Sequence, residues 1–198
     1  MRRESNGTNG KADVSGGVEA MSCNRFEGYE RFAVEKTGHK KKIFVLLTVL
    51  AVSVGCDQAT KYWARILLGG HETISCLGGL FRLQYIENTG AFLGLGGHLP
   101  GHFRFALLIG FVSFFLLGLM VYLLASRKLT PFSLAPGALI LGGGLSNLID
   151  RLLNQGSVVD FMHIGIGPLR TGVFNVADLA AMAGVVLFAF SLKRQKNI

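Results

Sequence analysis

Four apolar runs, separated by polar segments, constrain this chain of 198 residues more than any other feature. The first begins at Ile43, the second covers 105–125, the third runs from about 134 to 149 and the fourth from about 173 to 192. Half of the residues are hydrophobic and the mean hydropathy is +0.44, which is too apolar for an ordinary soluble domain. Because such runs are long enough to cross a bilayer, the sequence predicts an all-α membrane protein with four transmembrane helices.

The polar N-terminal segment differs from this apolar region. Residues 1–39 are rich in Gly, Ser and Asn and hold six Lys/Arg and six Asp/Glu. Since such a segment has little apolar surface to offset the entropy lost on ordering, we expect residues 1–39 to form a disordered cytoplasmic tail. Residues 40–198 are then expected to form the four-helix membrane domain.

The basic residues flank the apolar runs and do not gather on one soluble face, so the net charge of +8 does not indicate nucleic-acid binding. The segments 39–42, 127–128 and 193–196 hold eight Lys/Arg, against six on the opposite side of the predicted bundle. Because cytoplasmic loops carry an excess of Lys and Arg, we expect both termini to lie in the cytoplasm.

In this topology, the outer ends of the helices collect acidic side chains. Asp57 follows the apolar part of the first run, Asp150 ends the third, and Asp178 begins the fourth. Asp160 lies in the segment that joins the last two runs. Because an acid at the edge of a membrane span is costly, it marks a functional site by default. We therefore predict a site near the outer face of the membrane.

Asp160 and Asp178 are the candidates for the chemistry of this site. Two carboxyl groups that meet can share one proton, so that one takes a proton from water and the other polarises a carbonyl group. The spacing leaves two alternatives open. Each acid caps a helix or pairs with Arg151 or Arg170, or the acids form the relay of a proton-coupled transporter or channel. A transporter would distribute its acids through the depth of the membrane.

Other polar residues at this depth fall at helical spacings. Asp57 and Lys61 lie at i and i+4 and are expected to pair. Asn147, Asp150 and Arg151 lie at i, i+3 and i+4 and so share one helix face. An Asp150–Arg151 pair would hold the outer end of the third span against the following loop. Both pairs are expected to be structural.

Further local patterns concern helix caps, a strand and helix packing. Asn175 lies one turn before Asp178 and is expected either to cap the fourth span or to orient that aspartate. In the outer segment 69–104, residues 81–85 alternate apolar and polar, which predicts a half-buried strand in a small sheet at the membrane surface. The glycines at 142–144 are expected to permit close packing of helices.

No metal or cofactor site is predicted. His98 and His102 share helical spacing, but the sequence offers no evident third ligand. Cys23, Cys56 and Cys76 show neither the spacing of metal ligands nor a paired framework. We expect them to be isolated thiols.

One alternative treats the first apolar run as an export signal. Residues 40–42, the apolar run and Val52–Cys56 look like the signal of a lipoprotein, with Cys56 at the cleavage point. A chain of that kind would be soluble after the cysteine, whereas here three more apolar runs follow. The alternative predicts that the mature protein lacks residues 1–55.

Five segments in chain order resemble the lipoprotein signal peptidase family, also called signal peptidase II. They are Asp57–Lys61, Asn88–Phe92, Gly142–Arg151, Val158–Phe161 and Phe174–Asp178. The resemblance covers residues 43–192 and implies an aspartic endopeptidase of the bacterial inner membrane. Such enzymes remove the signal peptide from prolipoproteins just before a cysteine to which a diacylglyceryl group has been attached.

This resemblance implies a role for each polar residue named above. It makes Asp160 and Asp178 the catalytic dyad, near the periplasmic face, under a small periplasmic β-sheet cradle. It assigns substrate binding or support of the site to Asp57, Lys61, Asn88, Gly90, Asn147, Asp150, Arg151 and Asn175. It implies no cofactor. The partners that it implies are diacylglyceryl-modified prolipoproteins, membrane lipid and inhibitors of the globomycin type.

Two features depart from the family's pattern. Ser146 stands where the family commonly has glycine, and we expect it to crowd the packing beside Asn147. The segment 161–172, between the two aspartates, is short and glycine-rich, so the shape of this loop is not predicted.

Overall fold

The computed structural model of the protein describes residues 15–90, 103, 106–126 and 129–195, with most side chains from residue 39 onward. The chain divides into two compact units, residues 1–40 and residues 41–198, and each is described by itself. Helix α1 (Ser15–Leu68) begins within the segment for which the sequence predicts disorder. The disordered tail and its boundary at residue 39 stay predictions, and His98 and His102 lie outside the described residues.

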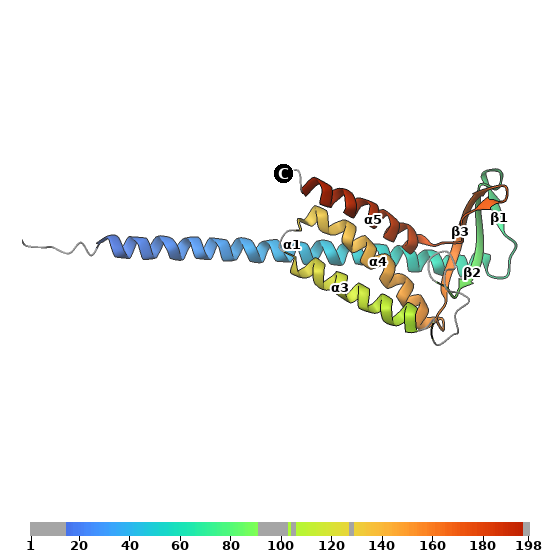
Figure 1. Ribbon diagram of the computed structural model, residues 1–198, viewed down its shortest axis with the longest axis horizontal. Helices are drawn as coiled ribbons and strands as arrows, with labels where there is room; N and C mark the ends of the chain where they lie inside the picture. Colours follow the sequence, from blue (N-terminus) through green and yellow to red (C-terminus); the bar gives the residue numbers. More distant parts are fainter. Residues whose placement is uncertain (1–14, 91–102, 104–105, 127–128, 196–198) are drawn as a thin grey trace, which may run out of the picture. The chain divides into compact units, whose positions relative to one another are not determined.

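Long helices make up most of the second unit (Figure 1). Its helical elements are the end of α1, the π-helical segment η3 (Ala106–Phe111), α3 (Val112–Ala125), α4 (Pro131–Leu153) and α5 (Val176–Gln195). The stretches His39–Leu68 and Leu108–Ala125 are long and apolar enough to cross a membrane, and Val176–Ser191 is a shorter apolar stretch. The four predicted helices are thus present, and two of them qualify as spans by length and composition.

Helix α4 is longer at both ends than the sequence predicts. It begins at Pro131 because Thr130 caps it: the Thr130 hydroxyl oxygen accepts a hydrogen bond of 3.2 Å from the Ser133 N–H. Proline suits the first helical position, where no intrahelical N–H bond is needed. The helix continues to Leu153, so Asp150 lies inside it and not in the loop that follows.

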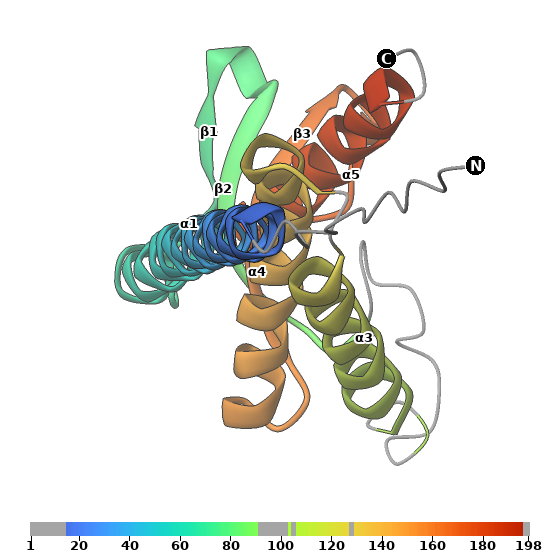
Figure 2. The same cartoon turned by 90° about the vertical axis from the view of Figure 1, so that its left-hand side faces the viewer.

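Helix α4 packs against both α3 and α5, which Figure 2 shows as two separate helices beside it. A Cβ atom added at the successive positions 142, 143 and 144 would meet Ser53 of α1, Ala177 of α5 and Leu116 of α3, respectively. Successive residues of a helix point about 100° apart, so three neighbouring glycines can serve three different contacts. The predicted role of these glycines in close helix packing is confirmed.

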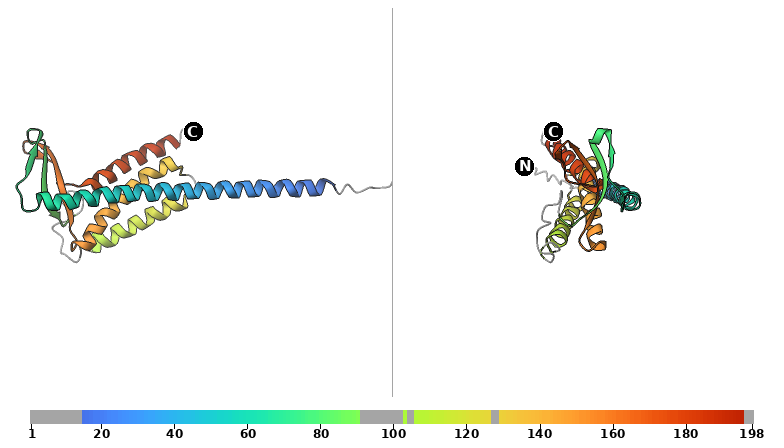
Figure 3. Two further views of the ribbon diagram at one scale, coloured as in Figure 1. Left: turned by 180° about the vertical axis from the view of Figure 1, so that it is seen from behind. Right: turned by 90° about the vertical axis from the view of Figure 1, so that its right-hand side faces the viewer.

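A four-stranded antiparallel sheet lies beyond one end of the helices (Figure 3). Its strands, in the order β1-β2-β3-β4, are Ile74–Cys76, Phe81–Asn88, Val158–Ile166 and Leu169–Arg170. Strand β2 confirms the strand predicted at 81–85. Strand β3 was predicted as loop, and it places Asp160 within the sheet.

An apolar cluster joins the sheet to the end of α1. Ala64, Leu68 and Phe161 are buried together, and Leu83 and Met162 pack against them. Because Phe161 follows Asp160 directly in β3, this cluster fixes the position of the strand that carries the aspartate.

Candidate active site

Asp160 is a buried carboxylate in the first half of β3, where four successive residues are buried. Its Oδ2 atom accepts a hydrogen bond of 2.7 Å from the Asn88 side-chain amide, which comes from the neighbouring strand β2. Its Oδ1 atom accepts one of 2.6 Å from the Asn175 side-chain amide. Each oxygen of the carboxylate therefore accepts a hydrogen bond from a different side-chain amide.

Asp178 lies in the first turn of α5, where Asn175 immediately precedes the helix. The Asp178 N–H donates a hydrogen bond of 2.9 Å to the Asn175 side-chain oxygen, and the Asn175 N–H donates one of 3.2 Å to Asp178 Oδ2. This reciprocal arrangement is a capping box. Asn175 thus caps the helix and orients the aspartate at once. Asp178 Oδ1 accepts a further hydrogen bond of 2.9 Å from Asn147 on α4.

Two side-chain amides bridge the pair of aspartates. Asn175 contacts both Asp160 and Asp178, and its amide group also donates 3.1 Å to the Asn147 side-chain oxygen. The ion pairs among the described residues involve neither Asp160 nor Asp178. The alternative in which these acids pair with arginine is therefore not seen, whereas capping by Asp178 is.

The surroundings of Asp160 change its acidity. Burial raises the pKa of the Asp160 carboxyl from 3.8 to about 6. The hydrogen bond from Asn88 lowers this pKa, and the nearby negative charge of Asp178 raises it. Because two like charges at close range do not both ionise easily, the pair is suited to sharing one proton.

Lys61 is a buried ammonium group at the centre of the supporting contacts. Its Nζ atom lies 2.7 Å from Asp57, 2.9 Å from Asp150 and 2.8 Å from the Asn147 side-chain oxygen. The predicted Asp57–Lys61 pair is confirmed. The predicted Asp150–Arg151 pair is wrong, because adjacent helical residues point in different directions and Lys61 of α1 reaches Asp150 instead.

Asp57 connects three helices. Its Oδ1 atom accepts a hydrogen bond of 2.7 Å from the Ala177 N–H at the start of α5. Its Oδ2 atom accepts a hydrogen bond of 2.7 Å from the Ser146 hydroxyl of α4. Ser146 was expected to crowd this region, but it is fully buried and its hydroxyl supplies this hydrogen bond. Gln58 donates 3.0 Å to the same hydroxyl and 2.8 Å to Asp150. Gln58 is a supporting residue that is not predicted from the sequence, where its signal is its place beside Asp57.

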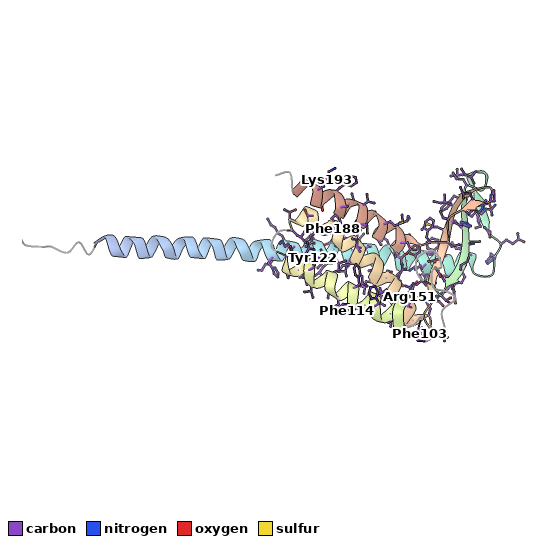
Figure 4. All side chains as sticks on the ribbon, in the orientation of Figure 1. Phe103, Phe114, Tyr122, Arg151, Phe188 and Lys193 are labelled. Atoms are coloured by element: carbon purple, nitrogen blue, oxygen red, sulfur yellow. The ribbon has the colours of Figure 1, made fainter. Side chains whose placement is uncertain are left out.

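Asp150 and Arg151 join the end of α4 to the sheet. Asp150 Oδ2 accepts a hydrogen bond of 3.1 Å from the N–H of Val159, the residue before Asp160 in β3. The Arg151 guanidinium donates a hydrogen bond of 2.9 Å to the Gly90 carbonyl. The Gly90 N–H in turn donates a hydrogen bond of 2.9 Å to the Asn88 side-chain oxygen. Figure 4 shows Arg151 at the end of α4 that meets the sheet, and Lys193 at the far end of α5.

The two proposed catalytic aspartates and the eight residues assigned to substrate binding or support therefore belong to one connected set of contacts. Asp57, Asp150, Asp160 and Asp178 gather in one region, which is not the distribution that a transporter relay predicts. Within the described part of the chain, no group of three or more His, Cys, Asp or Glu is arranged to hold a metal ion.

Apolar helices that end in an amide-bridged pair of carboxyl groups, one buried and one half-buried, are an arrangement suited to a membrane enzyme of the aspartic type. The family model described as Signal peptidase (SPase) II matches residues 43–194. The chain belongs to this family of aspartic-type peptidases. The match runs through Cys56, a free and exposed thiol in α1, so the segment that looks like an export signal lies within the region that the family model matches.

Relatives and solved structures agree with this assignment. A lipoprotein signal peptidase of Moorella thermoacetica is 38% identical over 149 residues, covering 75% of this chain and 91% of the relative. One of Syntrophus aciditrophicus is 31% identical over 160 residues, covering 80% and 98%. A bacterial membrane enzyme solved at 2.3 Å resolution by the in meso method is 25% identical, with a TM-score of 0.62 over 78% of this chain and 90% of its own. The function class of the chain is that of a lipoprotein signal peptidase.

Proposed function

We propose that this chain is a membrane-embedded aspartic endopeptidase that removes the signal peptide from diacylglyceryl-modified prolipoproteins, just before the lipidated cysteine. Asp160 and Asp178 form its catalytic dyad and activate the attacking water. The observation that carries the proposal is the amide bridge. The Asn175 side-chain amide donates to Asp160 and to Asn147, and Asn147 donates to the Asp178 carboxylate, so that hydrogen bonds link two carboxyl groups from different elements.

The reaction divides the roles of acid and base between the two carboxyl groups. The ionised carboxylate takes a proton from water as the water oxygen attacks the carbonyl carbon before the lipidated cysteine. The protonated carboxyl donates a hydrogen bond to the carbonyl oxygen. The C–N bond of the tetrahedral intermediate then breaks as a proton passes to the leaving amine. The pKa of Asp160, about 6, supports this role because the group changes charge near the working pH.

The neighbouring residues bind the substrate or hold the dyad. Arg151 Nε is buried and has no hydrogen-bond partner among the described residues, so it can donate to a substrate carbonyl. Asn88 and Asn147 orient the carboxylates through the hydrogen bonds described above. Lys61 acts one step further away, because its ammonium group holds Asn147 in place.

The proposed topology has four membrane spans, both termini in the cytoplasm and the dyad near the periplasmic face of the bacterial inner membrane. It is supported by the exposed apolar side chains on the helices, such as Phe114, Val185 and Phe190. Lys193 lies at the end of α5 that is remote from Asp178, as expected for the cytoplasmic side (Figure 4).

The substrate's lipid would keep its cysteine at the membrane surface, at the depth of the dyad. The apolar signal helix would enter sideways from the bilayer, between the spans. Limited water at such a site strengthens the electrostatic interactions of the dyad. Cyclic peptides of the globomycin type are expected to compete with the substrate for this site.

The direct test is cleavage of a purified diacylglyceryl-modified prolipoprotein by the detergent-solubilised protein. We expect cleavage by the wild type and none by Asp160→Asn or Asp178→Asn. Glu72→Gln is the matched control, because it also neutralises an acid but at an exposed position away from the dyad. It should cleave at the wild-type rate. Folded Asp160→Asn protein with unchanged cleavage would overturn the assignment of the dyad.

A further inference from the structure

Ser146 places a fully buried hydroxyl group at the contact of α4 with α1. In the interior of a helix, a serine hydroxyl commonly turns back to a carbonyl group of its own helix. The Ser146 hydroxyl instead donates a hydrogen bond of 2.7 Å to Asp57 Oδ2 and accepts one of 3.0 Å from the Gln58 side-chain amide. Gln58 also donates a hydrogen bond of 3.3 Å to the Ser146 carbonyl. Because the hydroxyl both donates and accepts across the helix contact, its direction is fixed.

The hydroxyl determines how the Asp57 carboxylate is oriented. Asp57 Oδ2 accepts hydrogen bonds from Ser146 and from the Lys61 ammonium group, each 2.7 Å long. The other oxygen, Oδ1, accepts a hydrogen bond of 2.7 Å from the Ala177 N–H. Ala177 is the second residue of α5, where an N–H group has no partner within the helix. Asp57 therefore acts as an external cap of α5, supplied by another helix.

This external cap is adjacent to Asp178. Ala177 precedes Asp178 directly in the chain, so the bond from Asp57 fixes the backbone that carries the aspartate. A second route runs along α4, because Asn147 follows Ser146 directly and donates a hydrogen bond of 2.9 Å to Asp178 Oδ1. Ser146 is thus linked both to the backbone and to the carboxylate of this end of α5.

We propose that Ser146 is a positioning residue of the peptidase reaction and that Gln58 assists it. The Ser146 hydroxyl, held by Gln58, fixes Asp57 as the external cap of α5 and so sets where the Asp178 carboxylate meets the substrate. This inference deepens the proposed function and rests on it, because the position of Asp178 limits the rate only if Asp178 takes part in cleavage. A misplacement of about 1 Å can lower a rate roughly 100-fold, so a side chain that touches no substrate can control turnover.

A purely structural role of the hydroxyl has a different signature. If the hydroxyl only joined α1 to α4, its removal would lower the free energy of unfolding and leave the turnover of each folded molecule unchanged. A positioning hydroxyl lowers kcat while KM stays near the wild-type value, because the substrate still binds but the proposed dyad is misplaced.

Ser146→Ala is the test variant, and Ser53→Ala is its matched control. Ser53 is also a buried serine at the contact of α1 with α4, since a Cβ atom added at Gly142 would meet its hydroxyl. Its hydroxyl, however, donates a hydrogen bond of 3.2 Å to the Leu50 carbonyl of its own helix. With a diacylglyceryl-modified prolipoprotein in detergent, we expect Ser146→Ala to lower kcat roughly 10-fold with KM little changed, and Ser53→Ala to keep both. Equal kcat values for the two folded variants would overturn the proposal.

Hydrogen exchange tests the route through Asp57 without reference to activity. In Ser146→Ala, the Ala177 N–H should exchange faster than in the wild type, because its acceptor is held less firmly and local opening becomes easier. Mass spectrometry of peptides that cover the start of α5 measures this exchange, which should not change in Ser53→Ala. A lower kcat with unchanged exchange would overturn the external-cap mechanism.

A double-mutant cycle tests the part of Gln58. Gln58 also donates a hydrogen bond of 2.8 Å to Asp150, so Gln58→Leu keeps some effect even without the Ser146 hydroxyl. We expect Gln58→Leu to lower kcat more in the wild type than in Ser146→Ala, because part of its effect passes through the hydroxyl. Equal decreases in the two backgrounds would contradict the assistance of Gln58.

The cleavage assay separates this inference from the proposed function. Cleavage retained by Asp178→Asn would sink the proposed function and the inference with it. Cleavage lost in Asp178→Asn but unchanged in Ser146→Ala would remove the inference alone and leave the proposed function standing.

Discussion

Asn175 donates a hydrogen bond of 2.6 Å to Asp160, although the two residues lie 15 positions apart and on opposite sides of a hairpin. The side-chain oxygen of Asn175 meanwhile caps α5 through the Asp178 N–H. One side chain thus fixes the start of a helix and the geometry between two acids. The cap and the proposed dyad are therefore coupled, and a change in one should appear in the other.

Replacing Asn175 by alanine should lower both activity and stability. The loss of an N-cap costs about 1 kcal/mol of the free energy of unfolding. The loss of a hydrogen bond to a charged group costs about 1.5–3 kcal/mol, which corresponds to a decrease in kcat/KM of roughly 10- to 100-fold. Cleavage kinetics and thermal unfolding in detergent measure the two effects. Asn154→Ala, whose side chain contacts Arg65 at the end of α4, is the control and should keep wild-type kinetics.

The pH dependence of cleavage should follow the Asp160 carboxyl. Its pKa of about 6 predicts that kcat/KM rises with pH through this value, because the dyad needs one ionised carboxylate. The hydrogen bond from Asn88 favours the charged form of Asp160 and so lowers its pKa. Asn88→Ala removes this bond and should raise the pKa. The rising limb of the pH profile should therefore move to higher pH in Asn88→Ala. A shift to lower pH, or none, would contradict the proposed part of Asn88.

The same carboxyl should make the protein less stable as pH rises. Its pKa is raised from 3.8 in the unfolded chain to about 6 in the folded protein, so the folded state binds the proton more tightly. The stabilising contribution of this proton is present below pH 3.8 and is lost as the pH rises through about 6. Asp160→Asn, which cannot ionise, should therefore unfold at a higher temperature than the wild type at pH 8. The difference should shrink at pH 4, and an advantage that grows on acidification would refute this account.

Lys61→Met should destabilise the protein strongly. It leaves Asp57 and Asp150 buried without their cation, and breaking a buried ion pair in this way costs about 3–5 kcal/mol. Thermal unfolding and the yield of folded protein measure the loss. Adding Asp150→Asn to Lys61→Met should restore part of the stability, because one uncompensated charge is removed. A double variant less stable than Lys61→Met would contradict the arrangement.

Gly143→Ala should disturb the site through packing alone. A Cβ atom at this position would press on the Ala177 carbonyl, in the first turn of α5 beside Asp178. Overpacking of this kind costs about 1–3 kcal/mol and displaces the helix that carries the aspartate. Cleavage should fall roughly 10-fold or more, since small displacements of reacting groups are costly. Gly118→Ala on α3 is the matched control, because its Cβ would meet nothing within 4 Å, and it should behave as the wild type.

Local spacing predicted the parts of this fold that depend on near neighbours in the sequence. The Asp57–Lys61 pair follows from one helical turn, and the strand at 81–85 follows from alternation on a half-buried surface. The close packing of the glycines at 142–144 follows from their small size in an apolar run. Each of these features is encoded within a few residues.

Features that depend on distant contacts escaped the same reasoning. Residues 158–161 of β3 are all buried, so the strand shows no alternation by which it could be recognised. The partner of Asp150 is Lys61, 89 residues earlier, and no spacing rule relates the two. The sequence places Asp160 and Asp178 near the outer face and assigns Asn147 and Asn175 to the site, but the hydrogen bonds by which these two amides link the acids became evident only from the structure.

The ion pair within α1 has a consequence for the order in which the protein is made. Asp57 and Lys61 come early in the chain and neutralise one another within a single helix. The first helix can therefore enter the bilayer with its two charges already matched, before any partner helix exists. Asp57 then acquires its contact with the Ala177 N–H only after a further 120 residues have been synthesised. The ion pair that neutralises the first helix during insertion thus later supplies the carboxylate that holds the start of the last helix.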